Sequence, residues 1–151
     1  MDKERTLTQE EKTLAGLAHG SIVLGLMSNG IGGILAALVI WVVKKDKSPY
    51  LAFQALQAMV YQAIIFMVVM LAWCCWGLLW MVLIFVPLLT NPGAYDAAPP
   101  AGMWVGLLLM VIPLGLWGLA ILYGLWGAAR SLNGHDFQYA LIGRWLKKQE
   151  D

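Results

Sequence analysis

Residues 64–86 read IIFMVVMLAWCCWGLLWMVLIFV, a stretch with no charged residue and no amide side chain. About 20 such residues are enough for a helix to cross the roughly 30 Å hydrocarbon core of a bilayer. Across the 151 residues, 60% are hydrophobic, only 13% are charged and the mean hydropathy is +0.70, whereas about 25% of the residues of a soluble domain are charged. The sequence therefore predicts an all-α integral membrane protein with a single membrane domain over residues 1–151.

The helix that contains this stretch is expected to begin before it and to cover about residues 52–86. Pro87 is expected to end the helix, because proline lacks an N–H group and disrupts a helix interior. At 1.5 Å per residue, this helix is longer than the hydrocarbon core is thick. Its first turns carry three glutamines, which we expect at or outside the membrane interface: Gln54, Gln57 and Gln62.

A second long helix is expected over about residues 103–130 and forms a hairpin with the first. Residues 90–102 are rich in Pro, Gly and Asn, which predicts a loop before it. Pro113 predicts a kink inside the helix. Asn133 and Gly134 favour a turn directly after it.

The N-terminal part of the chain predicts a shorter hairpin, with helices over about 8–27 and 32–43 separated by a turn at residues 28–30. Thr8 and Glu11 have the spacing of a capping box at a helix start. Charge and proline are expected to end the second helix of this pair in a basic cytoplasmic turn, formed by Lys44, Lys45, Asp46, Lys47, Ser48 and Pro49.

The distribution of positive charge predicts the topology. All ten Lys and Arg residues lie in three segments: Lys3, Arg5 and Lys12; Lys44, Lys45 and Lys47; and Arg130, Arg144, Lys147 and Lys148. The connections at 28–31 and 90–102 contain none of them. Because cytoplasmic flanks are enriched in Lys and Arg, we expect four membrane helices as two hairpins in the inner (plasma) membrane, with both termini cytoplasmic.

Two alternatives remain open for residues 13–43. A single merged helix would leave the basic N-terminal residues on the opposite side, which the charge pattern disfavours. In a re-entrant pair, the chain enters the membrane and returns to the same side without crossing. This arrangement leaves the basic residues on the same side as a pair of crossing helices would, so the charge pattern does not separate the two.

The two ends of the chain are expected on the cytoplasmic side. Residues 1–12 form a charged leader, and no cleavage site of the A-x-A type follows the first apolar run, so we expect that run to remain in the mature protein. Residues 131–151 form a tail in which apolar side chains recur at four-residue intervals. This pattern predicts a short interfacial helix with Phe137, Leu141 and Trp145 on one face.

A few polar residues lie within the apolar segments. His19 is ionisable, and such a residue inside a membrane segment is a functional candidate by default; we favour a structural role as a neutral imidazole bonded to a neighbouring helix. Gln54, Gln57 and Tyr61 lie within about 60° of one another on a helical wheel. Together with Gln62, they either bond to neighbouring helices or line a hydrated vestibule.

Small residues at four-residue spacing predict faces where helices approach closely. We favour packing within one chain for this set, which consists of Gly16, Gly20, Ala120, Gly124 and Ala128.

The sequence contains no G-x-S-x-G or H-E-x-x-H motif and no phosphate-binding glycine loop. Cys74 and Cys75 are adjacent, which does not suit a disulfide framework or a zinc site, and we expect them to pack as apolar residues. His19 and His135 have no acidic cluster beside them. We therefore expect no enzymatic activity, cofactor or metal, and the net charge of +1 gives no indication of nucleic-acid binding.

Four segments carry a family resemblance: A-x-x-x-H-G-S at 15–21, IWVVKKDKSPY at 40–50, FQALQAMVYQ at 53–62 and FQYALIGRWL at 137–146. With them, the chain resembles a bacterial family of small membrane proteins of unknown function, which is similar to the twenty-kilodalton component of the chloroplast inner-envelope import translocon. The resemblance covers about residues 10–146 and implies four membrane segments with both termini inside.

Two functions follow as hypotheses. The first is a non-enzymatic membrane subunit or scaffold, whose partners are the lipid bilayer and other membrane proteins or further copies of the chain. The second is a pore or translocation component, in which His19 and the glutamines Gln54, Gln57 and Gln62 line a polar path.

Overall fold

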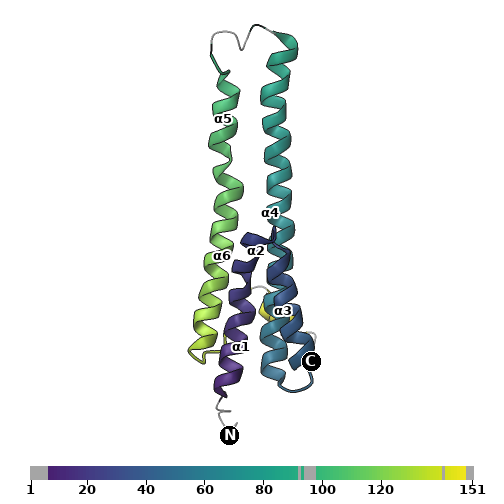
Figure 1. Ribbon diagram of the computed structural model, residues 1–151, viewed down its shortest axis with the longest axis vertical. Helices are drawn as coiled ribbons and strands as arrows, with labels where there is room; N and C mark the ends of the chain where they lie inside the picture. Colours follow the sequence, from purple (N-terminus) through teal and green to yellow (C-terminus); the bar gives the residue numbers. More distant parts are fainter. Residues whose placement is uncertain (1–6, 92, 94–97, 141, 149–151) are drawn as a thin grey trace. The chain divides into compact units, whose positions relative to one another are not determined.

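The computed structural model describes residues 7–91, 93, 98–140 and 142–148, and the regular structure in these residues is helical throughout (Figure 1). The prediction of an all-α chain is confirmed. The elements are α1 (Gln9–Gly20), the 3₁₀ turn η1 (Ser21–Val23), α2 (Leu24–Met27), α3 (Ile31–Lys44), α4 (Pro49–Thr90), α5 (Ala101–Leu109), α6 (Val111–Leu132) and α7 (Ile142–Lys147).

The chain divides into two compact units. Unit 1 comprises Met1–Phe66 and Ala120–Asp151, and unit 2 comprises Met67–Leu119. The long helices α4 and α6 contribute residues to both units. Unit 1 is thus built from the two ends of the sequence.

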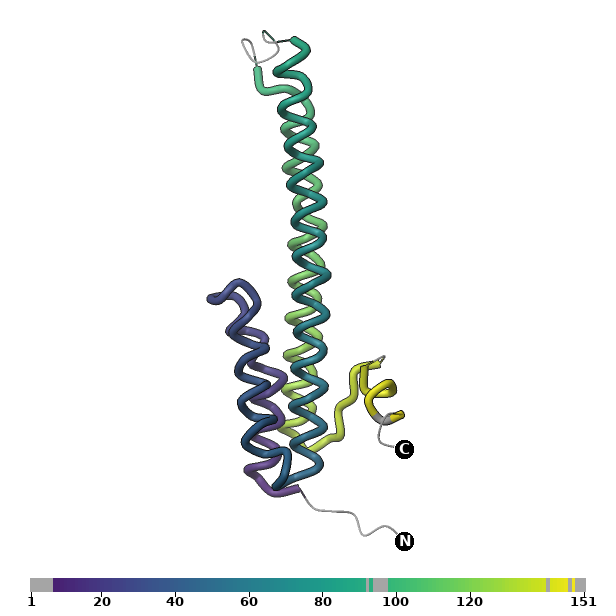
Figure 2. The backbone as a smooth tube through the Cα atoms, turned by 90° about the vertical axis from the view of Figure 1, so that its right-hand side faces the viewer, coloured from purple at the N-terminus to yellow at the C-terminus, as the bar shows by residue number. Residues whose placement is uncertain are grey.

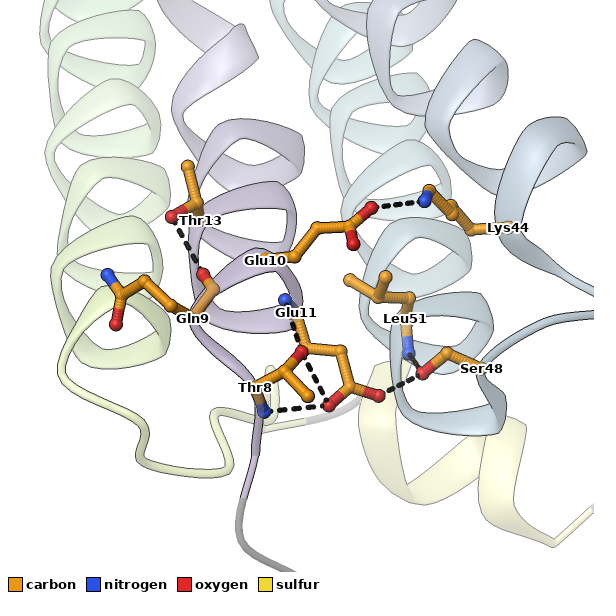
Figure 3. A network of polar contacts seen from close by, with 8 residues as sticks. All are labelled: Thr8, Gln9, Glu10, Glu11, Thr13, Lys44, Ser48 and Leu51. Carbon is orange, nitrogen blue, oxygen red and sulfur yellow. Dashed lines mark hydrogen bonds and ion pairs between the residues drawn. The ribbon is translucent and has the colours of Figure 1, made fainter.

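The start of α1 is held by the predicted capping box, which is confirmed (Figure 3). The Glu11 backbone N–H donates to Thr8 Oγ1 at 3.2 Å, and the Thr8 backbone N–H donates to Glu11 Oε2 at 3.0 Å. Ser48 Oγ donates to the other Glu11 oxygen at 2.6 Å and accepts from the Leu51 N–H at 3.3 Å. One glutamate therefore connects the start of α1 to the start of α4.

The turn between α2 and α3 satisfies its own polar groups. Asn29 has φ +50° and Gly30 has φ +95°, and the Gly30 N–H donates to the Gly25 carbonyl at 2.8 Å, the bond of a Schellman motif. Ser28 Oγ donates to the Leu24 carbonyl at 2.7 Å and accepts from the Gly32 N–H at 2.7 Å. The chain reverses here into the antiparallel hairpin of α1, α2 and α3 (Figure 1).

Helix α4 is longer than expected at both ends. It begins at Pro49 rather than near residue 52, because Ser48 accepts a backbone N–H and proline suits the first helical turn. It also continues through Pro87 to Thr90, so the prediction that Pro87 ends it is wrong. Proline has no N–H group to donate to the carbonyl four residues earlier, which belongs to Leu83. This carbonyl lies close to Gly102, where an added Cβ would be 2.8 Å from its oxygen.

The last long helix is interrupted, as Pro113 predicts. The interruption falls at Met110, between α5 and α6, and the Met110 N–H is shared between the Gly106 and Leu107 carbonyls at 3.2 and 3.3 Å. Within unit 2, Trp76 Nε1 also donates to the Gly106 carbonyl at 2.8 Å. Gly106 has no side chain to separate α5 from α4, and the Trp80 ring occupies the space that its Cβ would need.

The tail differs from the prediction. Its helix is limited to Ile142–Lys147, and Phe137 lies before it in a non-helical segment, with its side chain buried. Trp145 is exposed, so the expected shared helical face of Phe137 and Trp145 is wrong. The four-residue spacing is misleading because Gly134, at φ +77°, turns the chain out of the helix first.

Two helical stretches are long and apolar enough to cross a membrane, Pro49–Thr90 and Ala101–Leu132. Helix α3 is apolar but has 14 residues, or about 21 Å at 1.5 Å per residue. Four membrane helices therefore stay a prediction. Cys74 and Cys75 are exposed on α4 rather than packed inside the chain, which corrects the expectation for them.

Some predicted features fall outside the described residues. These are the leader residues Lys3 and Arg5, part of the loop at 90–102, Leu141, and the last three residues of the tail.

Candidate functional site

Unit 1 contains a buried polar cluster, here called the His19 cluster, formed by His19, Gln54, Gln57, Phe137 and Tyr139. The side chains of His19, Gln54 and Gln57 are fully buried, and Tyr139 is 2% exposed. Helix α1 supplies the histidine, α4 the two glutamines, and the segment between α6 and α7 the other two residues. Figure 2 shows this segment returning alongside α4 after the end of α6.

The partners of His19 define its tautomer. Nε2 lies 2.9 Å from Gln54 Oε1, which only accepts, so Nε2 donates. Nδ1 lies 3.1 Å from the Tyr139 hydroxyl. Burial raises the pKa of Tyr139, so its phenol stays protonated and donates to Nδ1. His19 is accordingly a neutral imidazole with both ring nitrogens bonded.

The two glutamines bind the main chain of the tail. Gln54 Nε2 and Gln57 Nε2 donate to the Phe137 carbonyl at 3.1 and 2.7 Å, and Gln57 Oε1 accepts from the Tyr139 N–H at 3.3 Å. Gln54 Nε2 also donates to Asp136 Oδ1 at 2.8 Å, and Gln57 Nε2 donates to Gln54 Oε1 at 2.7 Å. Every amide group in the cluster therefore has a partner.

Aromatic rings surround these hydrogen bonds. Tyr61 stacks on Tyr139 with ring centroids 4.0 Å apart and an interplanar angle of 12°. Phe137 meets His19 edge to face at 5.4 Å, and Tyr123 contacts Phe137 in the same way at 5.9 Å. The rings exclude water from the cluster, which strengthens its hydrogen bonds.

The other residues of the predicted polar stripe bond to neighbouring helices. The Tyr61 hydroxyl donates to the Ala120 carbonyl at 2.9 Å. Gln62 Nε2 donates to the Ala18 carbonyl and to Ser21 Oγ, both at 3.1 Å. The structure thus gives each polar residue of the proposed path at least one hydrogen-bond partner in the protein, although Gln62 Oε1 is buried without one. The pore hypothesis stays a prediction.

The predicted packing residues lie between α1, η1 and α6. A Cβ on Gly16 would lie 2.5 Å from Leu132 Cγ, and one on Gly20 would lie 3.6 Å from Ala128 Cβ. A Cβ on Gly124 would lie 3.0 Å from Ile22 Cγ2. Ala120 is buried in the same helix and accepts the Tyr61 hydroxyl.

The basic turn lies at one end of unit 1. Lys44 forms an ion pair with Glu10 (Figure 3), and Lys45 Nζ lies 5.2 Å from the centre of the Trp41 ring. Asp46 and Lys47 are exposed. Ser48 is buried against Glu11, and Pro49 opens α4, as described above.

The residues from Asp136 to Tyr139 were missed as site residues in the sequence. A signal was present: three glutamines and a histidine in apolar helices need partners, and a polar and aromatic segment directly after an Asn-Gly turn can supply main-chain groups. The hydrogen bonds of the cluster attach the tail to α1 and α4. Among the described residues, no group of three His, Cys, Asp or Glu side chains is placed to hold a metal ion.

Two long apolar helices joined to a helical unit with a closed polar core are the features of a helical membrane protein. A family model described as the magnetosome magnetite crystal formation protein family, MamF/MmsF, matches residues 10–146, and the chain belongs to this family of membrane proteins. No curated protein and no solved structure matches the chain. The resemblance to the chloroplast import component is therefore wrong, and the match over residues 10–146 assigns the chain to the magnetosome family instead.

Proposed function

We propose that the protein acts without catalysis, as a structural component of the membrane in which magnetite crystals form. The observation that supports this is the surface of its two long helices. In the most apolar windows of Pro49–Thr90 and Ala101–Leu132, only 6% and 17% of the residues are buried within the chain. Such faces need lipid or the helices of other membrane proteins around them. Lateral packing against copies of the chain or other membrane proteins is the action that fits them.

The topology in this proposal has α4 and the α5–α6 pair crossing the inner membrane or a membrane derived from it. The exposed basic residues near the ends of α3 and α6, such as Lys45, Lys47 and Arg130, would face the cytoplasm together with both termini. The connection after Thr90 would face the opposite side.

Self-association is testable with two differently tagged copies in a magnetite-forming bacterium that lacks its own copy of the protein. We expect the two tags to co-purify in mild detergent. Cys74 and Cys75 are free and exposed on α4, so oxidation of the membranes is expected to link the copies through disulfides. The matched control is the double variant Cys74→Ser/Cys75→Ser, which should co-purify but not cross-link.

The same strain tests the mineral role. Without the protein, electron microscopy is expected to show smaller or fewer magnetite crystals, and the tagged chain should restore them. Tags that fail to co-purify, together with crystals that do not depend on the protein, would rule out the proposal.

A further inference from the structure

The hairpin of α1, α2 and α3 has a polar end and an apolar end. Its charged residues are Glu10, Glu11 and Lys12 at the start of α1 and Lys44 at the end of α3, and residues 13–43 contain no Asp, Glu, Lys or Arg. The start of α1 and the end of α3 therefore lie at the same, charged end of the hairpin. The turn at the other end, residues 28–30, is uncharged.

The apolar end of the hairpin is exposed. Met27 is 92% exposed, and Leu24, Leu26 and Ile31 are about half exposed on either side of the turn. Leu35 and Val39 continue this exposed surface along α3. Groups of this kind are stable in hydrocarbon and unfavourable in water.

The backbone of the turn forms hydrogen bonds within the protein, as a turn surrounded by hydrocarbon requires. In lipid, every backbone N–H and C=O group must be satisfied within the protein. The Gly30 N–H reaches the Gly25 carbonyl, and Ser28 Oγ bonds both the Leu24 carbonyl and the Gly32 N–H. Asn29 is the exposed polar side chain at this turn, and it is uncharged.

The hairpin is too short to cross. Its uncharged arms, Thr13–Met27 and Ile31–Val43, have 15 and 13 residues, or about 22 and 20 Å at 1.5 Å per residue. The hydrocarbon core is about 30 Å thick. An arm that starts at the charged level therefore ends inside the core.

We infer that the hairpin is a re-entrant membrane element, which enters from the side of the basic turn, ends inside the hydrocarbon and returns to the same side. Its partner is the lipid acyl chains around Met27 and the two helix faces beside it. The buried bonds of Ser21 Oγ to the Ala18 and Gly33 carbonyls, at 2.8 and 3.0 Å, hold the two arms together without water.

Single cysteines in the Cys74→Ser/Cys75→Ser background test this inference in full-length protein in native membranes. The positions are Met27→Cys at the turn, Val43→Cys on an exposed face near the charged end, and Lys47→Cys in the exposed basic turn. Each side of the membrane is treated separately with a maleimide that cannot cross it. We expect Lys47→Cys to react from one side only and Met27→Cys to react from neither side until detergent is added.

A nitroxide attached at Met27→Cys then identifies what surrounds the turn. We expect it to be more accessible to oxygen than to a nickel chelate, and deeper in the membrane than the same label at Val43→Cys. Reaction of Met27→Cys from the side opposite Lys47→Cys would show that the hairpin crosses. Reaction from the same side would show that it lies in water, and a nitroxide inaccessible to both reagents would show a protein partner. Each of these results would overturn the inference.

Discussion

The side chain of His19 connects three parts of unit 1, because both of its ring nitrogens form hydrogen bonds. The ring joins α1 to α4 through Gln54 and to the tail through Tyr139. Removal of the ring takes the hydrogen-bond acceptor from the buried Tyr139 hydroxyl and leaves Gln54 Oε1 with Gln57 Nε2 as its remaining donor. A buried unsatisfied group costs about 1–3 kcal/mol, and the loss of a buried ring adds the cost of a cavity.

We expect His19→Ala to destabilise the protein by about 3 kcal/mol or more and to release the tail. The measurements are thermal unfolding in detergent and the rate of trypsin cleavage at Arg144, which is exposed in the tail. His135→Ala is the matched control, because His135 is exposed and has no resolved interaction with the cluster. Equal melting temperatures and cleavage rates for the two variants would contradict a structural role for His19.

At the scale of elements, close approach between helices depends on Gly33. This residue lies on α3 where it passes η1, and a Cβ there would overlap the side-chain oxygen of Gln62. It would also lie 2.7 Å from the Ser21 carbonyl oxygen and 3.1 Å from Ile22 Cα. These two are backbone atoms, so relief of the overlap requires α3 to move.

We expect Gly33→Ala to lower stability by about 1–3 kcal/mol, the usual cost of overpacking. Gly118→Ala on α6 is the control, since a Cβ there meets nothing within 4 Å and alanine favours a helix more than glycine does. The measurement is the melting temperature of each variant, compared with that of the unchanged protein. An unchanged Gly33→Ala variant would mean that α3 is not held where the structure places it.

The sequence predicts the helices of this protein well and the tail poorly, for a physical reason. The capping box at Thr8 and the turn at residues 28–30 are local signals, and the local backbone satisfies them. Pro87 is a local signal too, but the helix tolerates it near its end. The attachment of Phe137 to Gln57 is not local, because 80 residues separate them. Spacing within the tail carries no information about a partner so distant in the chain.

At the scale of the whole molecule, the two long apolar helices leave most of their side chains unburied within the chain. Helix α4 has 42 residues, or about 63 Å at 1.5 Å per residue, about twice the thickness of the hydrocarbon core. The part of α4 in unit 2 is apolar from Met67 to Leu89, whereas the part in unit 1 carries the three buried glutamines. The two parts of one helix thus have different environments.

We expect an added lysine to weaken membrane attachment more on the unit 2 part of α4 than next to the basic turn. Leu78 is 65% exposed on the unit 2 part of α4, and lysine at the centre of a membrane helix costs about 2.5–3.5 kcal/mol. Leu78→Lys should therefore reduce the fraction of protein that resists alkaline extraction from membranes. Val43→Lys, at an exposed position next to Lys44, should not. Equal retention of both variants would argue against lipid around Leu78.

The closure of unit 1 by segments far apart in the sequence also imposes an order on the synthesis of this protein. His19 and Tyr139 are 120 residues apart, so all of unit 2, residues 67–119, is translated between them. Until Tyr139 has been added, α1 and the start of α4 lack the tail groups to which His19, Gln54 and Gln57 bond. A chain that stalls before Tyr139 therefore presents polar groups without their partners and is recognisable as incomplete.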